Sequence, residues 1–580
     1  MSSRLFTRIN CIPVTLFFVL GAACCSAAIL RVIDYPLSLV SSPFAALVMG
    51  AWGLTWKRGA GFALGLRSGA VVLAVSTVSL LLPPAAASVI TSTPCEPSYG
   101  LLFIVLGPMS SGLAGLVLGL PVGRFVRRRW LAVVTMVGII LLTVAVAFAE
   151  FLFTPGIRFY GTFYGLYHGA IYDEAVFVEG PYLWLRLWNL AAGALGIALM
   201  GLSGLRKDLT TKTPRHQDAP KTAQFVVIGL LAAGTAALTL LAPTLGFVSS
   251  RIPLDKALSM HVDTPHFELR CPPSGRAAAI APHIAEDLEF RAEQIVTMFQ
   301  LPEPEEKITV YLYDSPRQKA QLMGAGRTSI AKPWLHELHI HTHDAGATII
   351  AHELAHVMLG ALSSSVFRVP VDLLVLPRPG VIEGAAESVE RGGGVLTVHQ
   401  WAEAMRRIGR QPDMAAILEG FSFWGKSSTL AYTACGSFVR YLLETHGPEP
   451  FSRLYGGASF AKAYQRPLND LLREWNGFLD GIVVDDDDLE LAEFVFSRPP
   501  VFLKVCPYAG ARCLSRAAAA AREGRYQDVA PIARLALTTT GGDVRLRLRL
   551  ARMLYAIREH EEGYNPPVAA GEAESPPLGP

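Results

Sequence analysis

The stretch that decides the fold of the second half of the chain is Ile349-Ile-Ala-His-Glu-Leu-Ala-His-Val-Met358. Its flanks are uncharged and free of proline, and apolar residues at 349, 350, 354, 357 and 358 predict a buried helix. On a helix, His352 and His356 lie one turn apart on one face, so both can bind a single zinc ion while Glu353 faces a metal-bound water. This HExxH pattern indicates hydrolytic chemistry. The alternative is an ordinary core helix with two hydrogen-bonded histidines.

A third ligand is needed, because catalytic zinc sites use three protein ligands and keep one position open for water. The best candidate is Glu383 in Val381-Ile-Glu-Gly-Ala-Ala-Glu-Ser388, on a second helix predicted to begin near Pro379 and Gly380. Glu387 follows one turn later on the same face, where it can accept a hydrogen bond from a ligating histidine and fix its orientation. Taken alone, this segment is better explained as an exposed helix start with carboxylates near the positive end of the dipole. Because HExxH lies upstream, we instead interpret Glu383 as the third metal ligand.

The residues around HExxH predict an α+β domain. Residues 276 to 300 have the pattern of an amphipathic helix, and Lys307-Ile-Thr-Val-Tyr-Leu-Tyr313 alternates like a strand. Glu337-Leu-His-Ile-His-Thr342 is a second strand candidate that leads into the HExxH helix. The acidic run Asp485 to Asp488 lacks the ligand spacing of a calcium loop and is interpreted as a helix start.

A cluster of histidines precedes the HExxH helix: His336, His339, His341 and His343. In a strand, the last three share one face at a period of two. A second metal site is one interpretation of this face. We prefer a strand that faces solvent or lines a groove.

Before residue 250 the sequence is typical of a membrane-spanning region. Its 580 residues are 51% hydrophobic, which is too apolar for an ordinary soluble protein of this length. Seven apolar stretches are long enough to cross a membrane as helices, at about 11–30, 37–56, 68–85, 100–121, 131–153, 181–203 and 223–247. An alternative for the first stretch is a signal peptide, but its long apolar run favours a retained anchor.

Lys and Arg in the short loops predict the orientation. With the N-terminus in the cytoplasm, the inside loops carry almost all of the basic residues, and the outside loops keep only Arg31 and Arg158. Everything after about residue 249 is then extracytoplasmic, and the protein is a multi-pass protein of the plasma or inner membrane. The net charge of +3 is explained by this topology, and no basic patch with interleaved aromatics indicates nucleic acid.

The outer part of the chain contains five of the eight cysteines, including Cys95 in an outer loop. Disulfides persist in that compartment, and Cys506 and Cys513 flank a short turn-rich segment where a local disulfide is plausible. Their spacing does not match a zinc knuckle. Cys435 lies in an apolar helical stretch and is expected to be a buried small residue.

The C-terminal residues differ again in character. Residues 514–537 and 543–558 are predicted to be helical, with a turn at 524–529, and resemble one degenerate tetratricopeptide-like pair. One such unit cannot bury a core alone, so we expect it to pack on the preceding domain. Residues 563–580 are rich in Pro, Gly, Ala and Glu and are predicted to be disordered.

HELAH at 352–356 followed by IEGAAE at 382–387 resembles the gluzincin metallopeptidases, particularly the Peptidase MA-like group. The segments 310–315, 431–442 and 466–475 are similar to the edge strand, the following helix and the closing helix of that family. The resemblance covers about residues 260–482. Gly380 and Val381 stand where the family pattern has Trp-Leu, and the spacer from His356 is longer than in the aminopeptidase branch.

The resemblance implies a role for each site residue. One zinc ion would be held by His352, His356 and Glu383, with Glu353 as general base and then general acid. Tyr432 is the candidate donor to the oxyanion, because gluzincin-like enzymes often use a tyrosine from a later helix. Tyr441 and His399 are weaker alternatives for that donor, and a core aromatic is the alternative interpretation of Tyr432.

The sequence therefore predicts a multi-domain chain: an all-α transmembrane bundle, an α+β zincin domain of gluzincin, thermolysin-like type, and a short C-terminal α-helical segment. The expected boundaries are 1–248, 249–498, 499–562 and a tail at 563–580. The predicted function is a zinc metallopeptidase that hydrolyses extracytoplasmic peptides or proteins. The alternative is a non-catalytic membrane sensor or scaffold whose zincin domain binds a partner. An intramembrane protease is disfavoured, because HExxH lies far beyond the last apolar stretch.

Overall fold

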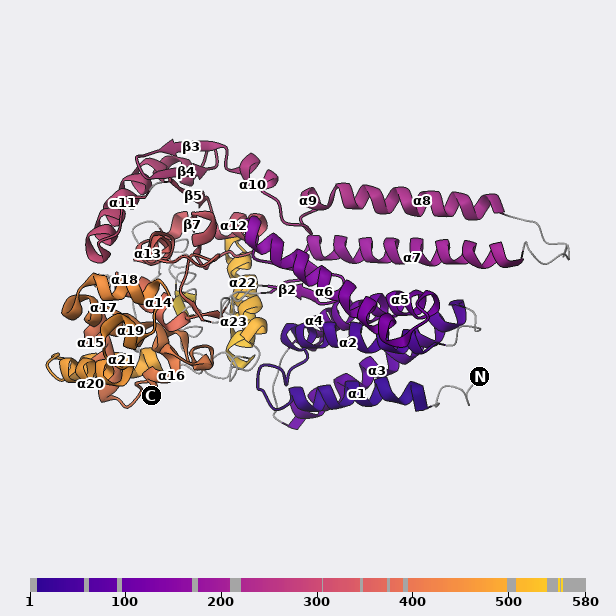
Figure 1. The fold of residues 1–580 in the computed structure, drawn as a ribbon, viewed down its shortest axis with the longest axis horizontal. Coiled ribbons are helices and arrows are strands. Elements are labelled where there is room, and N and C mark those ends of the chain that lie inside the picture. The colour runs from indigo at the N-terminus through magenta and orange to yellow at the C-terminus, as the bar shows by residue number, and fades with distance from the viewer. Residues whose placement is uncertain are drawn as a thin grey trace, which may run out of the picture.

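The computed structural model describes residues 8–56, 62–90, 96–168, 176–208, 221–304, 306–344, 348–372, 376–389, 395–497, 507–539, 551–552 and 554–555. The chain is mostly helical and has two parts of different architecture. Long helices fill the N-terminal part, and a small sheet wrapped by shorter helices follows (Figure 1). The predicted second C-terminal helix at 543–558 falls largely outside the described residues, as does the tail.

The N-terminal part contains the helices α1 (Arg8–Cys24), α2 (Tyr35–Thr55), α3 (Phe62–Ile90), α4 (Pro97–Ile104), η2 (Val105–Met109), α5 (Ser110–Phe125), α6 (Arg129–Phe153), α7 (Gly180–Asp208), α8 (Lys221–Leu240) and α9 (Ala242–Leu245). Five helical stretches are long and apolar enough to cross a bilayer: Tyr35–Thr55, Phe62–Ile90, Ser98–Phe125, Arg129–Phe153 and Gly180–Met200. The other two predicted spans correspond to α1 and α8, whose described apolar portions are shorter. This part is a membrane region by length and composition.

Close backbone approach holds two of these helices together. A Cβ added to Gly115 of α5 would lie 2.1 Å from the carbonyl oxygen of Ala46 on α2, and one added to Gly119 would lie 2.2 Å from that of Gly50. Small residues at such spacing are the usual packing device between helices in lipid, where no hydrophobic effect drives association. A short hairpin of β1 (Phe159–Gly161) and β2 (Gly165–Tyr167) follows α6.

The second part is built on a five-stranded sheet in the order β3-β4-β5-β7-β6. The strands are β3 (Met260–Asp263), β4 (Phe267–Cys271), β5 (Ile308–Tyr313), β6 (Ile330–Lys332) and β7 (Glu337–His341). The three central strands run parallel, and each edge strand is antiparallel to its neighbour. The predicted strands at 307–313 and 337–342 are confirmed as β5 and β7, which are hydrogen-bonded neighbours.

The helices of this part are α10 (Ile252–Ala257), α11 (Arg276–Phe299), α12 (Pro316–Met323), α13 (Ile349–Leu359), α14 (Pro379–Ser388), α15 (Val398–Arg407), α16 (Met414–Leu418), α17 (Ser428–His446), α18 (Pro448–Tyr455), α19 (Phe460–Tyr464), α20 (Leu468–Leu479) and α21 (Asp486–Phe496). Short 3-10 turns are η3 (Pro333–Leu335), η4 (Thr342–Asp344), η5 (Gly360–Leu362) and η6 (Phe421–Gly425), and β8 (Val371–Asp372) pairs with β9 (Leu376–Pro377). α11 confirms the predicted amphipathic helix. The acidic run does begin a helix, because Asp485 and Asp488 form the capping box of α21.

Both faces of the sheet are covered. Val310 and Leu312 of β5 join α11 and α13 in the main core. Tyr311 and Tyr313 point to the other face, into a cluster with Leu254 of α10 and residues of α12. Since strand side chains alternate between faces, each face of β5 is lined by residues of one parity.

Because both faces of the sheet are covered, the prediction that the histidine strand faces solvent or lines a groove is wrong. All of β7 is buried, and His339 is fully so. Its ring stacks on Tyr311 at 4.8 Å, and its Nδ1 lies 2.9 Å from the hydroxyl of Tyr313. Burial lowers the pKa of His339 to about 4. His343 belongs to η4 rather than to the strand. His339 and His341 therefore belong to the interior, so the strand does not line a groove or face solvent, whereas His343 in η4 is exposed.

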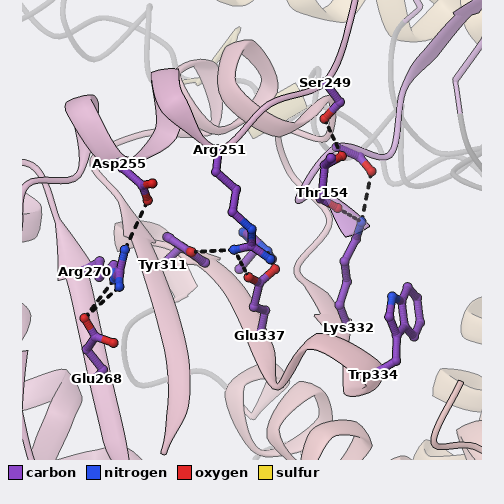
Figure 2. A network of polar contacts seen from close by, with 12 residues as sticks. Thr154, Ser249, Arg251, Asp255, Glu268, Arg270, Tyr311, Lys332, Trp334 and Glu337 are labelled. Atoms are coloured by element: carbon purple, nitrogen blue, oxygen red, sulfur yellow. Dashed lines mark hydrogen bonds and ion pairs between the residues drawn. The ribbon is translucent and has the colours of Figure 1, made fainter. Parts of the chain in front are cut away.

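The two parts meet at the end of α6 (Figure 2). Lys332 of β6 is buried, and its Nζ donates to the backbone carbonyls of Phe151, Thr154 and Gly156 at 3.1, 2.7 and 2.9 Å. Trp334 of η3 donates from Nε1 to the carbonyl of Leu152 at 2.9 Å. These donors satisfy carbonyls that the end of a helix leaves without intrahelical partners. The membrane helix is thus tied directly to the edge of the sheet.

The C-terminal helices α22 (Pro507–Arg522) and α23 (Tyr526–Thr539) pack on each other, with the predicted turn between them at Gly524. We expected this segment to pack on the preceding domain. Instead, the buried Arg512 donates to both carboxylate oxygens of Asp34 at the start of α2, at 3.0 and 2.9 Å. Tyr508 makes a ring contact with Tyr35 at 5.1 Å. The last helices therefore dock on the N-terminal helices.

The cysteine predictions have mixed outcomes. Cys435 is fully buried in α17, as predicted. Cys513 is a free, buried cysteine, and the other half of the plausible disulfide, Cys506, lies outside the described residues. Cys513 stands on the regular helix α22 beside Arg516 rather than in a turn-rich segment.

Candidate metal centre

Three helices build the candidate site. β7 and η4 lead toward α13, which carries His352, Glu353 and His356 and is buried along most of its length. α14 begins at Pro379, where proline at the first turn of a helix costs no hydrogen bond, and carries Glu383 and Glu387. α17 packs against α14 and brings Tyr432 to the histidines.

The predicted ligands converge on one point. The Nε2 atoms of His352 and His356 each lie 3.4 Å from the same Oε2 of Glu383. The ligand atoms of these three residues all lie within 4.8 Å of one another. Among the described residues, this is the one group of histidines, cysteines or carboxylates with such a spacing. Two imidazole nitrogens and a carboxylate oxygen are a donor set that zinc accepts in catalytic sites.

The three predicted ligands are largely buried to different degrees. The His352 and His356 side chains are 6% and 11% exposed, whereas the Glu383 side chain keeps 20% of its surface exposed. Glu353 is half-buried on the same helix. Among the three donors, Glu383 is thus the one that keeps the largest exposed fraction.

Glu387 lies where a partner of a ligating histidine belongs. Its Oε2 is 3.4 Å from Nδ1 of His352, on the side of the ring opposite to the nitrogen that faces Glu383. Carboxylates in this position hold the ring orientation and tautomer of a metal-binding histidine. Glu387 fits the predicted role by position.

The charges in the site are strongly coupled. Burial opposes ionisation of Glu383, but the neighbouring His356 and His352 outweigh it and hold the pKa of Glu383 well below its ordinary value. Burial disfavours a charged His352, but its contacts with Glu383 and Glu387 raise its pKa well above the usual range. Burial raises the pKa of Glu353. The carboxylates therefore stabilise positive charge where the two histidines meet, which suits a divalent cation as well as a proton.

Tyr432 lies beside the ligands rather than away from them. Its ring stacks on that of His352 with centroids 6.1 Å apart and on that of Phe423 at 5.7 Å. The weaker alternatives Tyr441 and His399 lie elsewhere. Tyr441 contacts Phe478, and His399 bonds the hydroxyl of Ser437. Nine residues along α17 separate the two tyrosines, about half a turn out of phase, so Tyr441 faces the opposite side.

Two glycines that we did not single out set the distance between α14 and α17. A Cβ on Gly384 would lie 2.8 Å from the carbonyl oxygen of Cys435, and a Cβ on Gly436 would lie 2.5 Å from Cγ of Glu387. Neither position has room for a side chain. The glycine inside the Glu-Gly-x-x-Glu segment was a visible signal of close packing, whereas nothing in the sequence marks Gly436 as its counterpart.

Lys319 of α12 is another residue that the sequence analysis did not identify. It is fully buried, its amine bonds the carbonyl of Thr328, and its charge acts to lower the pKa of Glu353. A lysine on a short polar helix carries no sequence signal of this placement.

No protein-family model matches the chain, and no curated protein matches it significantly.

Proposed function

We propose that the chain is a membrane-anchored zinc metallopeptidase with a gluzincin-type site in a zincin domain. The observation that carries the proposal is the convergence of His352, His356 and Glu383 on one point, with Glu353 on the same helix as the histidines. The parallel strands β5 and β7, the HExxH helix and the helix of the third ligand are the parts that such a domain needs. Other divalent ions also bind imidazole and carboxylate ligands. We propose zinc because two histidines and one glutamate are a ligand set of hydrolytic zinc sites.

Each site residue has a separate role in the proposed hydrolysis. Bound zinc would lower the pKa of a coordinated water and polarise the scissile carbonyl. Glu353 accepts the water proton at its carboxylate and later gives it to the leaving amine. The raised pKa of Glu353 favours this exchange, because a base with a pKa nearer to neutrality can also act as the acid. Glu387 holds the ring of His352, and the Tyr432 hydroxyl is the proposed donor to the developing oxyanion.

The proposal places this site outside the cytoplasm. The end of α6 contacts the sheet, whereas the ends of α7 and α8 that flank the basic residues 206–221 lie on the side of the bundle away from it (Figure 1). Arg124 and Arg127–Arg129 stand between α5 and the start of α6, also at the end of α6 opposite to the sheet. Basic loops remain in the cytoplasm, so the sheet and its helices belong to the other side.

The test compares three purified full-length chains in nanodiscs: wild type, Glu353→Gln and Glu303→Gln. Glu303 is an exposed glutamate of the same part and serves as the matched control. We expect one zinc per chain in all three by metal analysis, and cleavage of an unfolded protein such as casein by wild type and control only. Loss of a general base lowers the rate about 10²- to 10⁴-fold.

Two outcomes would contradict the proposal. Full activity of Glu353→Gln would exclude the mechanism. Stoichiometric zinc in a wild-type chain that cleaves neither casein nor envelope proteins would favour the sensor or scaffold instead. A comparison of terminal peptides of envelope proteins between cells with wild type and cells with Glu353→Gln provides the second readout.

A further inference from the structure

A turn with an apolar tip stands in the connection between α13 and α14, the two helices that carry the proposed metal ligands, ahead of β8 and β9. Residues 363–370, Ser-Ser-Ser-Val-Phe-Arg-Val-Pro, follow α13 and η5 and precede α14. Val366 at the tip is 79% exposed. Exposed turn tips are usually built from Gly, Asn, Asp, Pro or Ser, so valine followed by phenylalanine is unusual there. This surface needs a partner that accepts apolar side chains.

The turn is ordered rather than loose. The hydroxyls of Ser363 and Ser365 both donate to the carbonyl of Val369, at 2.9 and 2.6 Å, and Ser365 accepts from the Val369 amide at 3.1 Å. Arg368 takes a left-handed backbone conformation with φ of 53° and donates from Nε to the carbonyl of Gly360 at 3.3 Å. These bonds fix Val366 in its outward position.

The turn continues an aromatic cluster at the end of α6. Phe367 makes edge contacts with Phe148 of α6 and Trp334 of η3, each with centroids 6.2 Å apart. Trp334 lies 5.0 Å from Phe151 of α6. Phe148 is itself 51% exposed, on a helix that is apolar enough to span a bilayer. The turn therefore extends a surface that already faces lipid.

The length of α6 places this cluster at the outer edge of the bilayer. Its 25 residues extend about 37 Å, while the hydrocarbon core is about 30 Å thick. Arg127 to Arg129 hold the start of the helix at the inner surface, so about 20 residues from Trp130 bring the chain to the region of Phe148. Tryptophan is enriched at such interfaces, and Trp334 stands there.

We propose that the turn at residues 363–370 rests in the outer interface of the lipid bilayer, with Val366 and Phe367 as its apolar contacts. Given the proposed peptidase function, this contact sets the metal site to cut polypeptide segments that lie close to the membrane surface, such as those of other membrane-anchored proteins. The turn lies in the connection between α13 and α14, so its contact with the membrane would position the proposed metal site relative to the bilayer surface.

The first experiment measures lipid contact without using activity. A photo-crosslinking benzoylphenylalanine replaces Val366 in the full chain, in nanodiscs of phosphatidylcholine and phosphatidylglycerol. The matched control replaces Val483, which is 82% exposed and lies between α20 and α21, far from α6 (Figure 1). We expect lipid adducts by mass spectrometry at position 366 and not at 483. Absence of adducts at 366, or crosslinks there to a second copy of the chain, would overturn the proposal.

The second experiment tests the substrate class. One cleavable peptide is used in two forms, either soluble or lipid-anchored with the scissile bond about ten residues from the anchor. Val366→Glu should lower cleavage of the anchored form roughly five- to tenfold, as for a charge placed near a membrane interface, and leave the soluble form unchanged. Val483→Glu should affect neither. Equal losses on both forms would overturn the substrate class. A wild type that cleaves neither form would contradict the proposed function alone, since the adducts still decide the lipid contact.

Discussion

Replacing Gly436 by alanine should displace a proposed metal ligand without touching the proposed metal site directly. The new Cβ would lie 2.5 Å from Cγ and 2.7 Å from Cβ of Glu387. Carbon atoms in contact prefer 3.5 to 4.0 Å, so about 1 Å of extra separation is required. The clash involves the stem of Glu387, which cannot swing away as a side-chain tip would. We therefore expect α14 to move away from α17 by about that distance.

The displacement is large on the scale of metal coordination. Glu383 and Glu387 are both on α14, so the third ligand moves with the helix. Ligand distances in metal sites hold to about 0.2 Å, and disturbance of residues that orient the ligands costs 10- to 100-fold in metal affinity. Overpacking costs about 1–3 kcal/mol of folding stability, offset by about 0.5–1 kcal/mol from replacing glycine within a helix.

The assay is zinc affinity by competition with a chromophoric chelator, together with thermal unfolding, on full-length protein in nanodiscs. Gly477→Ala is the control, because Gly477 lies in α20 and a Cβ there meets nothing within 4 Å. We expect Gly477→Ala to bind zinc like wild type and to be equally or slightly more stable. If Gly436→Ala bound zinc as tightly as Gly477→Ala, the close packing of α14 on α17 would not position the ligand.

Three further predictions concern other parts of the molecule. Burial lowers the pKa of Lys332 to about 7, so an unfolded chain binds more protons between pH 7 and 10.5 and stability should rise with pH across that window by up to roughly 4–5 kcal/mol. Thermal unfolding of Lys332→Met should lack this slope, and an unchanged slope would contradict the assignment. Arg512→Met leaves the Asp34 carboxylate buried without its partner and should cost about 3–5 kcal/mol, with much of the loss recovered when Asp34→Asn is added. Equal unfolding temperatures of single and double variants would argue against a coupled pair. Tyr432→Phe should lower kcat about 10²- to 10³-fold with zinc affinity unchanged, and a change in KM alone would exclude an oxyanion role.

The local chemistry of the site was predictable because it depends on helical spacing. His352 and His356 had to share a face once the segment was helical, and Glu383 with Glu387 followed from the same rule one helix later. The distance between α14 and α17, which positions Glu383 and Glu387, was not predictable. It depends on Gly436, whose missing side chain matters only because α17 happens to cross α14 at that residue.

The histidine strand shows a second limit of the sequence. The period of two correctly placed His339 and His341 on one face, in register with Tyr311 and Tyr313 of the neighbouring strand. Which side of the sheet is covered depends on how α10 and α12 pack on it, which the strand pattern does not record. Alternation assigns side chains to faces but does not say what lies over each face.

The contact between Lys332 and α6 also imposes an order on the folding of the protein. The carbonyls that Lys332 binds precede it by 176 to 181 positions in the chain. At about 5 to 20 residues per second, a ribosome needs roughly 10 to 35 s to add that length. Until then the end of α6 has only water as a partner for these carbonyls. The edge of the sheet is completed only where α6 has already formed, so a chain in which α6 is not in place should also leave Lys332 and Trp334 without these partners.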